Sequence, residues 1–202
     1  TFNRNENHVG AFNFAGTHPG TISNCTFTCE DANGSMAFLN APMNTSRTAF
    51  GIIAWNVNTL NIGTDLNLNT TGNNFRFANT HVYAIVSGVN VKRSNFSKMI
   101  NWQAPTLGAG GQLNVVNGVA ICAYGTTGNS NQQLNVGGLG LGEQCTFDGS
   151  WPGNNRRGAG IVSTNNIHVN VLGNAFSSLK YGVAVNKLPG FTTVSGSSVI
   201  QN

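Results

Sequence analysis

Charged side chains are scarce in this sequence. Of its 202 residues, six are Asp or Glu and ten are Lys or Arg, while 40% are hydrophobic. Disordered chains combine high charge with few apolar residues, so this composition argues against disorder. Surfaces that bind nucleic acids carry dense basic stripes. Here the only adjacent basic pairs are Lys92-Arg93 and Arg156-Arg157, so the net charge of +4 does not predict a nucleic-acid partner.

Two apolar patterns are also missing. No segment has the i, i+3, i+4, i+7 spacing of an amphipathic helix, so long helices are not expected. No apolar run reaches the length of about 18 residues that a membrane-crossing helix requires, so no membrane span is predicted. Asparagine, by contrast, outnumbers even the 26 glycines. Both residue types tolerate left-handed backbone at tight turns, which favours many short strands joined by turns.

Cysteine is limited to four positions, and no C-x-x-C pair occurs among them. The four histidines are scattered, so neither a zinc site nor another cofactor is predicted. Cys25 and Cys29 could form a disulfide only if the chain turns between them, because an extended strand would hold their Cα atoms about 13 Å apart. The alternative is that the cysteines are buried or half-buried free thiols.

One short unit recurs along the whole chain. Its aromatic residue follows, by two positions, a Cys, Asn or Ser, as in Cys25-Thr26-Phe27 and Cys145-Thr146-Phe147. Most steps between these aromatic residues are about 21 to 29 residues long, and two are about 50, which we interpret as double steps with one degenerate unit each. The aromatic residues are Phe2, Phe27, Phe75, Phe96, Phe147 and Phe176, and Ile200 is a candidate to continue the series.

Two strand-like runs separate these units. A short β-rich run led by glycine or another small residue occurs at 50–54, 83–87, 117–121, 158–162 and 181–185. A run with period-2 alternation follows, clearest where Ile167, Val169 and Val171 share one face. Strand-only units of this length cannot bury their apolar faces alone, so they must stack on copies of themselves. The predicted fold is an all-β parallel β-helix, a solenoid of about eight turns with two loop insertions.

Units such as GNAFSSLKYGVAV, residues 173–185, resemble the rungs of the right-handed parallel β-helix, or pectin-lyase-like, family. The resemblance covers nearly the whole chain and implies one right-handed β-helical segment, residues 1–202. The Asn-rich, charge-poor style further resembles β-helical regions of large secreted or cell-surface proteins of Bacteroidota-type bacteria, some of them cargo of type IX secretion. Because the chain begins inside a repeat unit, we expect an interior piece of a longer protein, in contact with neighbouring parts of it.

Enzymes of this family act on acidic polysaccharides with clustered carboxylates, and the motifs of its hydrolases (Asn-Thr-Asp, Asp-Asp, Gly-His-Gly and Arg-Ile-Lys) are absent here. The remaining catalytic candidates are Glu143 and Asp148, which flank a Cys-Thr-Phe corner, with Arg156 on the next turn. Glycoside cleavage uses two carboxylates about 5 to 10 Å apart. The alternative is that both are solvated loop carboxylates, and the sequence favours a protein that is not an enzyme.

Binding is the better supported class of function. Insertions at about 28–47 and 101–111 interrupt the repeat and must project as loops, where recognition often resides. Trp102 and Trp151 lie in non-repeat segments beside Asn, Gln and Arg, and we expect them to bind a ligand such as a sugar. The alternative is that each ring caps a loop against the rod. Trp55, inside a strand-like run, is expected to be packed.

The sequence therefore predicts a non-catalytic structural or adhesive segment of a secreted or cell-surface protein. The expected partner is a glycan or cell-surface polysaccharide. The alternative is a polysaccharide lyase or glycoside hydrolase of the pectin-lyase-like family, or a phage tailspike, with an active site mostly outside this segment.

Overall fold

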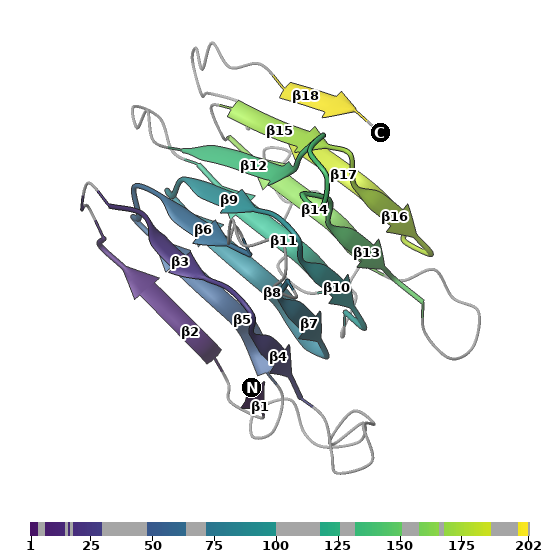
Figure 1. Ribbon diagram of the computed structural model, residues 1–202, viewed down its shortest axis with the longest axis horizontal. Helices are drawn as coiled ribbons and strands as arrows, with labels where there is room; N and C mark the ends of the chain where they lie inside the picture. The colour runs from purple at the N-terminus through teal and green to yellow at the C-terminus, as the bar shows by residue number, and fades with distance from the viewer. Residues whose placement is uncertain are drawn as a thin grey trace, which may run out of the picture.

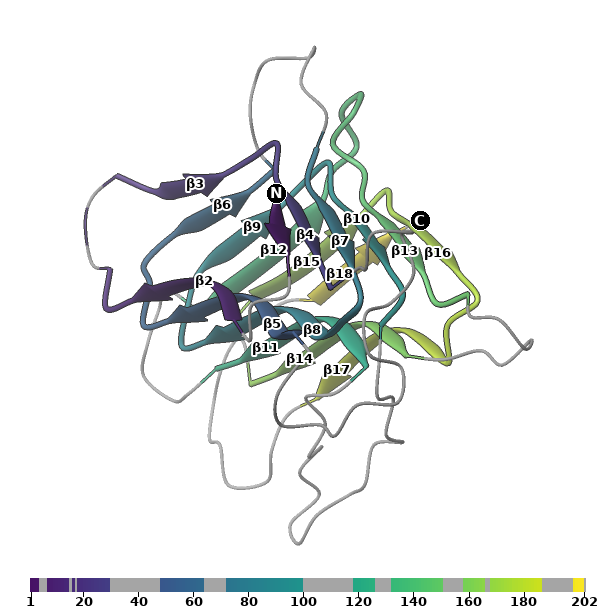
Figure 2. The ribbon, with the colours of Figure 1, turned by 90° about the horizontal axis from the view of Figure 1, so that it is seen from below.

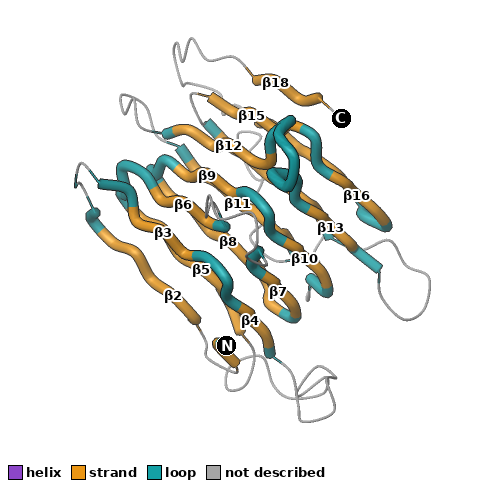
Figure 3. The backbone as a smooth tube through the Cα atoms, viewed as in Figure 1, coloured by secondary structure: helices purple, strands orange, loops and turns teal. Residues whose placement is uncertain are grey.

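The computed structural model of the chain is all-β (Figure 1). Figure 3 colours the backbone by secondary structure, and every regular element within the described residues is a β-strand. These residues include no helix that is long and apolar enough to cross a membrane. The structure describes residues 1–3, 7–14, 16, 18–29, 48–63, 72–99, 118–125, 132–150, 158–165, 168–186 and 198–201.

The strands form three sheets of six. Sheet A contains β1 (Phe2–Asn3), β4 (Thr26–Thr28), β7 (Asn74–Arg76), β10 (Asn95–Ser97), β13 (Thr146–Asp148) and β16 (Ala175–Ser177). Sheet B contains β2 (Asn7–Phe12), β5 (Thr48–Trp55), β8 (Ala78–Ile85), β11 (Val119–Tyr124), β14 (Ala159–Thr164) and β17 (Tyr181–Asn186). Sheet C contains β3 (Gly20–Ile22), β6 (Leu60–Ile62), β9 (Val89–Val91), β12 (Gln133–Gly137), β15 (His168–Leu172) and β18 (Ser198–Gln201).

Each strand pairs in parallel with the strand three places further along the chain. Thus β1 pairs with β4, β2 with β5 and β3 with β6, and the same rule continues to β15 and β18. Within the residues that the structure describes, the chain therefore passes from sheet A to sheet B to sheet C six times, and we call each passage a round. Figure 2 shows sheet B along one side of the molecule and sheets A and C along the other. The all-β, parallel architecture predicted from the repeat is confirmed.

The recurring phenylalanines form one column on the inner face of sheet A. Phe27 lies between Phe2 and Phe75, with ring centroids 5.1 Å and 4.6 Å away, and the later rings stack at 4.7–4.9 Å. Rings at these separations attract each other in addition to burying apolar area. The predicted column is confirmed, and it consists of Phe2, Phe27, Phe75, Phe96, Phe147 and Phe176.

The two long steps of the repeat are single rounds. Phe27 pairs directly with Phe75, and Phe96 pairs directly with Phe147. We expected about eight turns because each long step was interpreted as two, whereas the described residues form six rounds. An inserted loop and a degenerate repeat lengthen a step equally, so only the strand pairing separates the two explanations.

The β-branched residues near the end of each sheet C strand form a second column. Ile62 and Val91 pair with each other and are fully buried. Ile200 pairs with Val171 in this column, so the expectation that Ile200 continues the phenylalanine series is wrong. The strand that contains Ile200 follows β17 of sheet B, and the chain enters sheet C after sheet B in every round.

The residue two positions before each phenylalanine lies at a corner between sheets C and A. Asn174 accepts a hydrogen bond from the Cys145 N–H at Oδ1 (2.9 Å) and donates from Nδ2 to the Val136 carbonyl (2.9 Å). Asn73 makes the same pair of bonds to the round before it. Small polar side chains recur here because buried backbone groups require partners. All four cysteines are free thiols, so the alternative of unbridged cysteines is the correct one.

Candidate functional site

Glu143 lies in the turn between β12 and β13, where its carboxylate bonds two neighbouring groups. Oε1 forms an ion pair with Lys92 Nζ, and Oε2 accepts a hydrogen bond from the Gly140 N–H at 3.1 Å. The hydrogen bond from Lys92, followed by that from Gly140, lowers the pKa of Glu143. The general acid of a glycosidase needs a raised pKa, whereas the pKa of Glu143 is lowered, so Glu143 does not suit that role.

Asp148, the last residue of β13, is hydrogen-bonded at both carboxylate oxygens. Ser150 donates from its N–H to Oδ1 (2.9 Å) and from Oγ to Oδ2 (2.7 Å), and Ser177 Oγ donates to Oδ1 (3.2 Å). Partial burial raises the pKa of Asp148, but these hydrogen bonds together outweigh burial, and the net pKa is lowered. The carboxylate thus joins its own round to the following one.

The two candidate acids bind different neighbouring rounds. Lys92 of an earlier round binds Glu143, and Ser177 of a later round binds Asp148. Within the described ranges, no three His, Cys, Asp or Glu side chains are grouped as a metal ion would require. The other residues that the sequence singled out lie outside the described residues, and they are Trp102, Trp151 and Arg156.

The outer face of sheet B carries a set of aromatic side chains. Side chains alternate between the two faces of a strand, and Ile52 and Ala54 lie in the core, so Trp55 points outward. The same alternation around Val82 and Ala84 turns Tyr83 outward. We call this outer surface the aromatic face. It comprises Phe12, Trp55, Tyr83 and Tyr124, together with Phe50, whose ring stacks on that of Tyr83.

Phe12 and Trp55 are the exposed part of the aromatic face. They pair in register on β2 and β5, and the two side chains are 57% and 52% exposed. The expectation that Trp55 is packed is wrong, because the core positions of β5 are the residues that alternate with it. Each ring is followed by an exposed asparagine, and Asn56 Nδ2 donates a hydrogen bond to Asn13 Oδ1 at 3.1 Å. Two rings and two amides therefore lie side by side at the surface.

Further along the aromatic face the rings are half-buried. The rings of Phe50 and Tyr83 stack with centroids 5.1 Å apart. Tyr83 and Tyr124 pack against a second buried cluster that contains Cys122. Burial, with smaller contributions from Cys122 and Tyr124, raises the pKa of Tyr83 to about 12, and burial raises the pKa of the Cys122 thiol to about 12. At neutral pH the phenol stays a donor, and the thiol is not the thiolate that nucleophilic chemistry needs.

In the comparisons with known proteins, no family model, no curated protein and no solved structure matches the chain. Its function is therefore argued from the geometry of its own residues. The aromatic face offers ring stacking and neutral hydrogen bonds, which are means of binding rather than of bond cleavage. Sequence reasoning missed this face, although the order Ile52-Ile53-Ala54-Trp55 contains the signal, because a residue that alternates with two core residues must point outward.

Proposed function

We propose that the chain is a right-handed parallel β-helix that serves as a non-catalytic structural or adhesive module of a secreted or cell-surface protein. The observation that carries this proposal is the strand order, in which every round repeats sheets A, B and C and pairs with the rounds beside it. This order supports a coil in which each round buries the apolar face of the next. A rod of this kind keeps surface groups at a fixed spacing, as a spacer or an adhesive surface requires.

The aromatic face supports an adhesive role toward a glycan or cell-surface polysaccharide. Exposed rings bind the apolar faces of sugars by stacking, and amides hydrogen-bond sugar hydroxyls. Trp55 and Phe12 supply the rings, and Asn13 and Asn56 supply the amides directly beside them. Large exposed apolar side chains gathered on one surface are typical of interaction sites.

Catalysis is not part of the proposal. Glu143 and Asp148 are the acidic residues that lie within the described ranges, and both carboxylates hold structural bonds to neighbouring groups. Their pKa values are lowered, so neither is a protonated acid at neutral pH.

The experiment is a paired measurement of binding and turnover on acidic and neutral polysaccharides. We expect polysaccharide binding without new reducing ends or unsaturated products. Trp55→Ala should weaken binding, because it removes the larger exposed ring of the aromatic face. Leu141→Ala is the matched control, since Leu141 is 89% exposed in the turn before β13, away from sheet B. Trp102→Ala and Trp151→Ala test the sites predicted from the sequence.

Either of two results would overturn the proposal. Turnover of any polysaccharide would show an enzyme. Loss of binding in Leu141→Ala to the same extent as in Trp55→Ala would show that the aromatic face is not the recognition surface.

A further inference from the structure

A row of asparagine amides crosses the outer face of sheet C. From the second asparagine onward, the Nδ2 of each donates a hydrogen bond to the Oδ1 of the asparagine on the preceding paired strand, at 2.7–2.8 Å. The row extends over β6, β9, β12 and β15 in strict register. We call it the amide ladder, and it consists of Asn61, Asn90, Asn135 and Asn170.

The amide ladder keeps unused hydrogen-bonding capacity on its outer side. A primary amide has two N–H donors and an oxygen with two lone pairs. Asn90 and Asn135 each use one N–H donor and one oxygen lone pair within the ladder. Each therefore retains one N–H donor and one lone pair. Because neighbouring strands lie about 4.8 Å apart, the ladder presents a donor and an acceptor at every step of that length.

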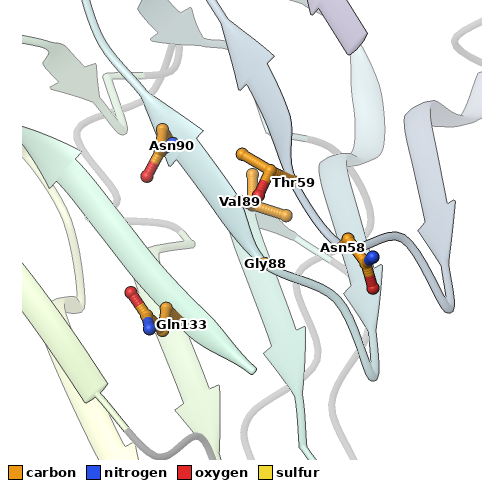
Figure 4. A pocket seen from close by; sticks show the side chains of 6 residues that line it. All are labelled: Asn58, Thr59, Gly88, Val89, Asn90 and Gln133. Atoms are coloured by element: carbon orange, nitrogen blue, oxygen red, sulfur yellow. The ribbon is translucent and has the colours of Figure 1, made fainter. Parts of the chain in front are cut away.

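A shallow open pocket of about 100 Å³ lies beside the ladder, lined from three consecutive strands of sheet C (Figure 4). Leu60 and Leu134 both pair with Val89, so the residues before them, Thr59 and Gln133, occupy the same register position as Gly88. Gly88 has no side chain, and its two neighbours in this row do. The pocket is the gap that this glycine leaves.

The size of the pocket excludes a closed site for a small molecule, since such sites enclose about 300 to 1,000 Å³. A volume of about 100 Å³ corresponds to about three water molecules. It therefore fits one substituent of a longer ligand whose remainder lies along the amide ladder. From Asn61 to Asn170 the ladder spans three strand spacings, or about 14 Å.

The groups on this face select the chemistry of the ligand. The described outward-facing residues of β3, β6, β9, β12 and β15 include no Asp, Glu, Lys or Arg. Asn90, Gln133 and Thr59 each combine donor and acceptor capacity. Carboxylates and phosphates only accept and ammonium groups only donate, whereas a hydroxyl group does both. A neutral ligand with closely spaced hydroxyls is the complement of this surface.

We infer that the amide ladder and the Gly88 pocket bind a neutral glycan chain, with one sugar substituent in the pocket and successive hydroxyls on the asparagines. The inference rests on the adhesive function proposed above and names a ligand class for it. It adds a second glycan-binding surface on sheet C, distinct from the aromatic face of sheet B.

The test is a titration with neutral oligosaccharides of increasing length, such as cello-, xylo- and malto-oligosaccharides, followed by calorimetry. Affinity should rise with chain length and level off once the ligand spans the ladder. Gly88→Gln should weaken binding at least about tenfold, because a side chain like that of Gln133 fills the pocket. Gly88 does not have the positive φ that requires glycine, and its register neighbours carry side chains, so this variant should keep the thermal stability of the wild type.

Asn95→Ala is the matched control. Asn95 belongs to a similar hydrogen-bonded row on the outside of sheet A, with Asn74 and Thr146, and its loss leaves sheet C untouched. We expect this variant to bind like the wild type, and Asn90→Leu to bind more weakly.

Three results would overturn the inference: unchanged binding in Gly88→Gln, binding of anionic polymers only, or no binding of any neutral oligosaccharide at millimolar concentration. The last result, accompanied by inhibition of ice growth, would indicate that the protein binds ice rather than sugar. None of these results overturns the proposed function, which polysaccharide turnover or an equal loss of binding in Leu141→Ala and Trp55→Ala would overturn instead.

Discussion

Val86 occupies the corner position that Asn56 holds one round earlier. Their φ angles are 50° and 54°, and the N–H of each donates to the carbonyl of the residue that ends the next strand of sheet B. Left-handed backbone suits asparagine but strains a β-branched side chain by about 1 to 2 kcal/mol. We therefore expect Val86→Asn to raise the free energy of unfolding by about 1 kcal/mol, as measured by urea denaturation.

The reciprocal variant is the control for Val86→Asn. Asn56→Val introduces the same strain and also removes the hydrogen bond to Asn13, so it should lower the free energy of unfolding by about 1 to 2 kcal/mol. Opposite signs for the two variants would establish the strain. A Val86→Asn protein that is less stable than the wild type would contradict it.

Asn174 has a buried amide that should contribute strongly to stability. It is 3% exposed and binds the Cys145 N–H and the Val136 carbonyl. Asn174→Ala would leave both backbone groups buried without these partners, which costs about 1 to 3 kcal/mol for each unsatisfied group. We expect a fall of at least about 2 kcal/mol in the free energy of unfolding, measured by chemical denaturation.

Asn170→Ala separates this effect from the general loss of an amide. Asn170 ends the amide ladder on the outer face of sheet C, where water replaces the lost hydrogen bond to Asn135. Its free energy of unfolding should fall by no more than about 1 kcal/mol. Equal losses in the two variants would mean that burial does not set the cost at Asn174.

The inner columns could be predicted from the sequence because one residue type fills each of them. Phe27, Phe75 and Phe96 recur at the same place in each unit, and the buried corner before them accepts only a small or amide side chain. Few residue types fit a column that is buried inside stacked rounds, so the repeat can be recognised in a single sequence.

The register of sheet B and its outer surface could not be predicted in the same way. The sequence aligned Phe50 with Tyr83, whereas Phe50 pairs with Thr80, three residues earlier. Two short β-rich runs can be aligned at several offsets with equally good matches. The correct offset depends on the backbone geometry of the corners between strands, which composition does not reveal. Nor did the sequence indicate that the amide ladder and the Gly88 pocket lie together, because both depend on the register of sheet C across rounds.

Phe96 should be costly to remove, because it lies in the middle of the phenylalanine column. It is 1% exposed, with Phe75 and Phe147 stacked on its two sides at centroid distances of 4.8 and 4.9 Å. Truncating a buried phenylalanine to alanine costs about 3 to 5 kcal/mol through lost burial and the cavity that remains. Phe176 is half-buried at the end of the column, so Phe176→Ala should cost less than Phe96→Ala in the same denaturation experiment.

His81 should make the stability of the protein depend on pH. Its side chain is fully buried beside Phe75 and Phe96, and neither ring nitrogen has a hydrogen-bond partner. Burial, and to a smaller extent the charge of His8, lowers the pKa of His81 to about 3, and burial lowers the pKa of His8 to about 4. An unfolded histidine has a pKa of about 6.5, so below this pH the unfolded chain binds protons that the folded chain does not.

The stability that comes from keeping His81 neutral is therefore present above about pH 6.5 and is lost as the pH falls toward 3. Each buried histidine should contribute a slope of about 1.4 kcal/mol per pH unit between about pH 6 and its folded pKa. Chemical denaturation at several pH values gives the slope of the free energy of unfolding against pH. His81→Ala should lower this slope by that amount, whatever the stability of the variant at neutral pH. An unchanged slope in His81→Ala would mean that the buried imidazole is not the origin of the pH dependence.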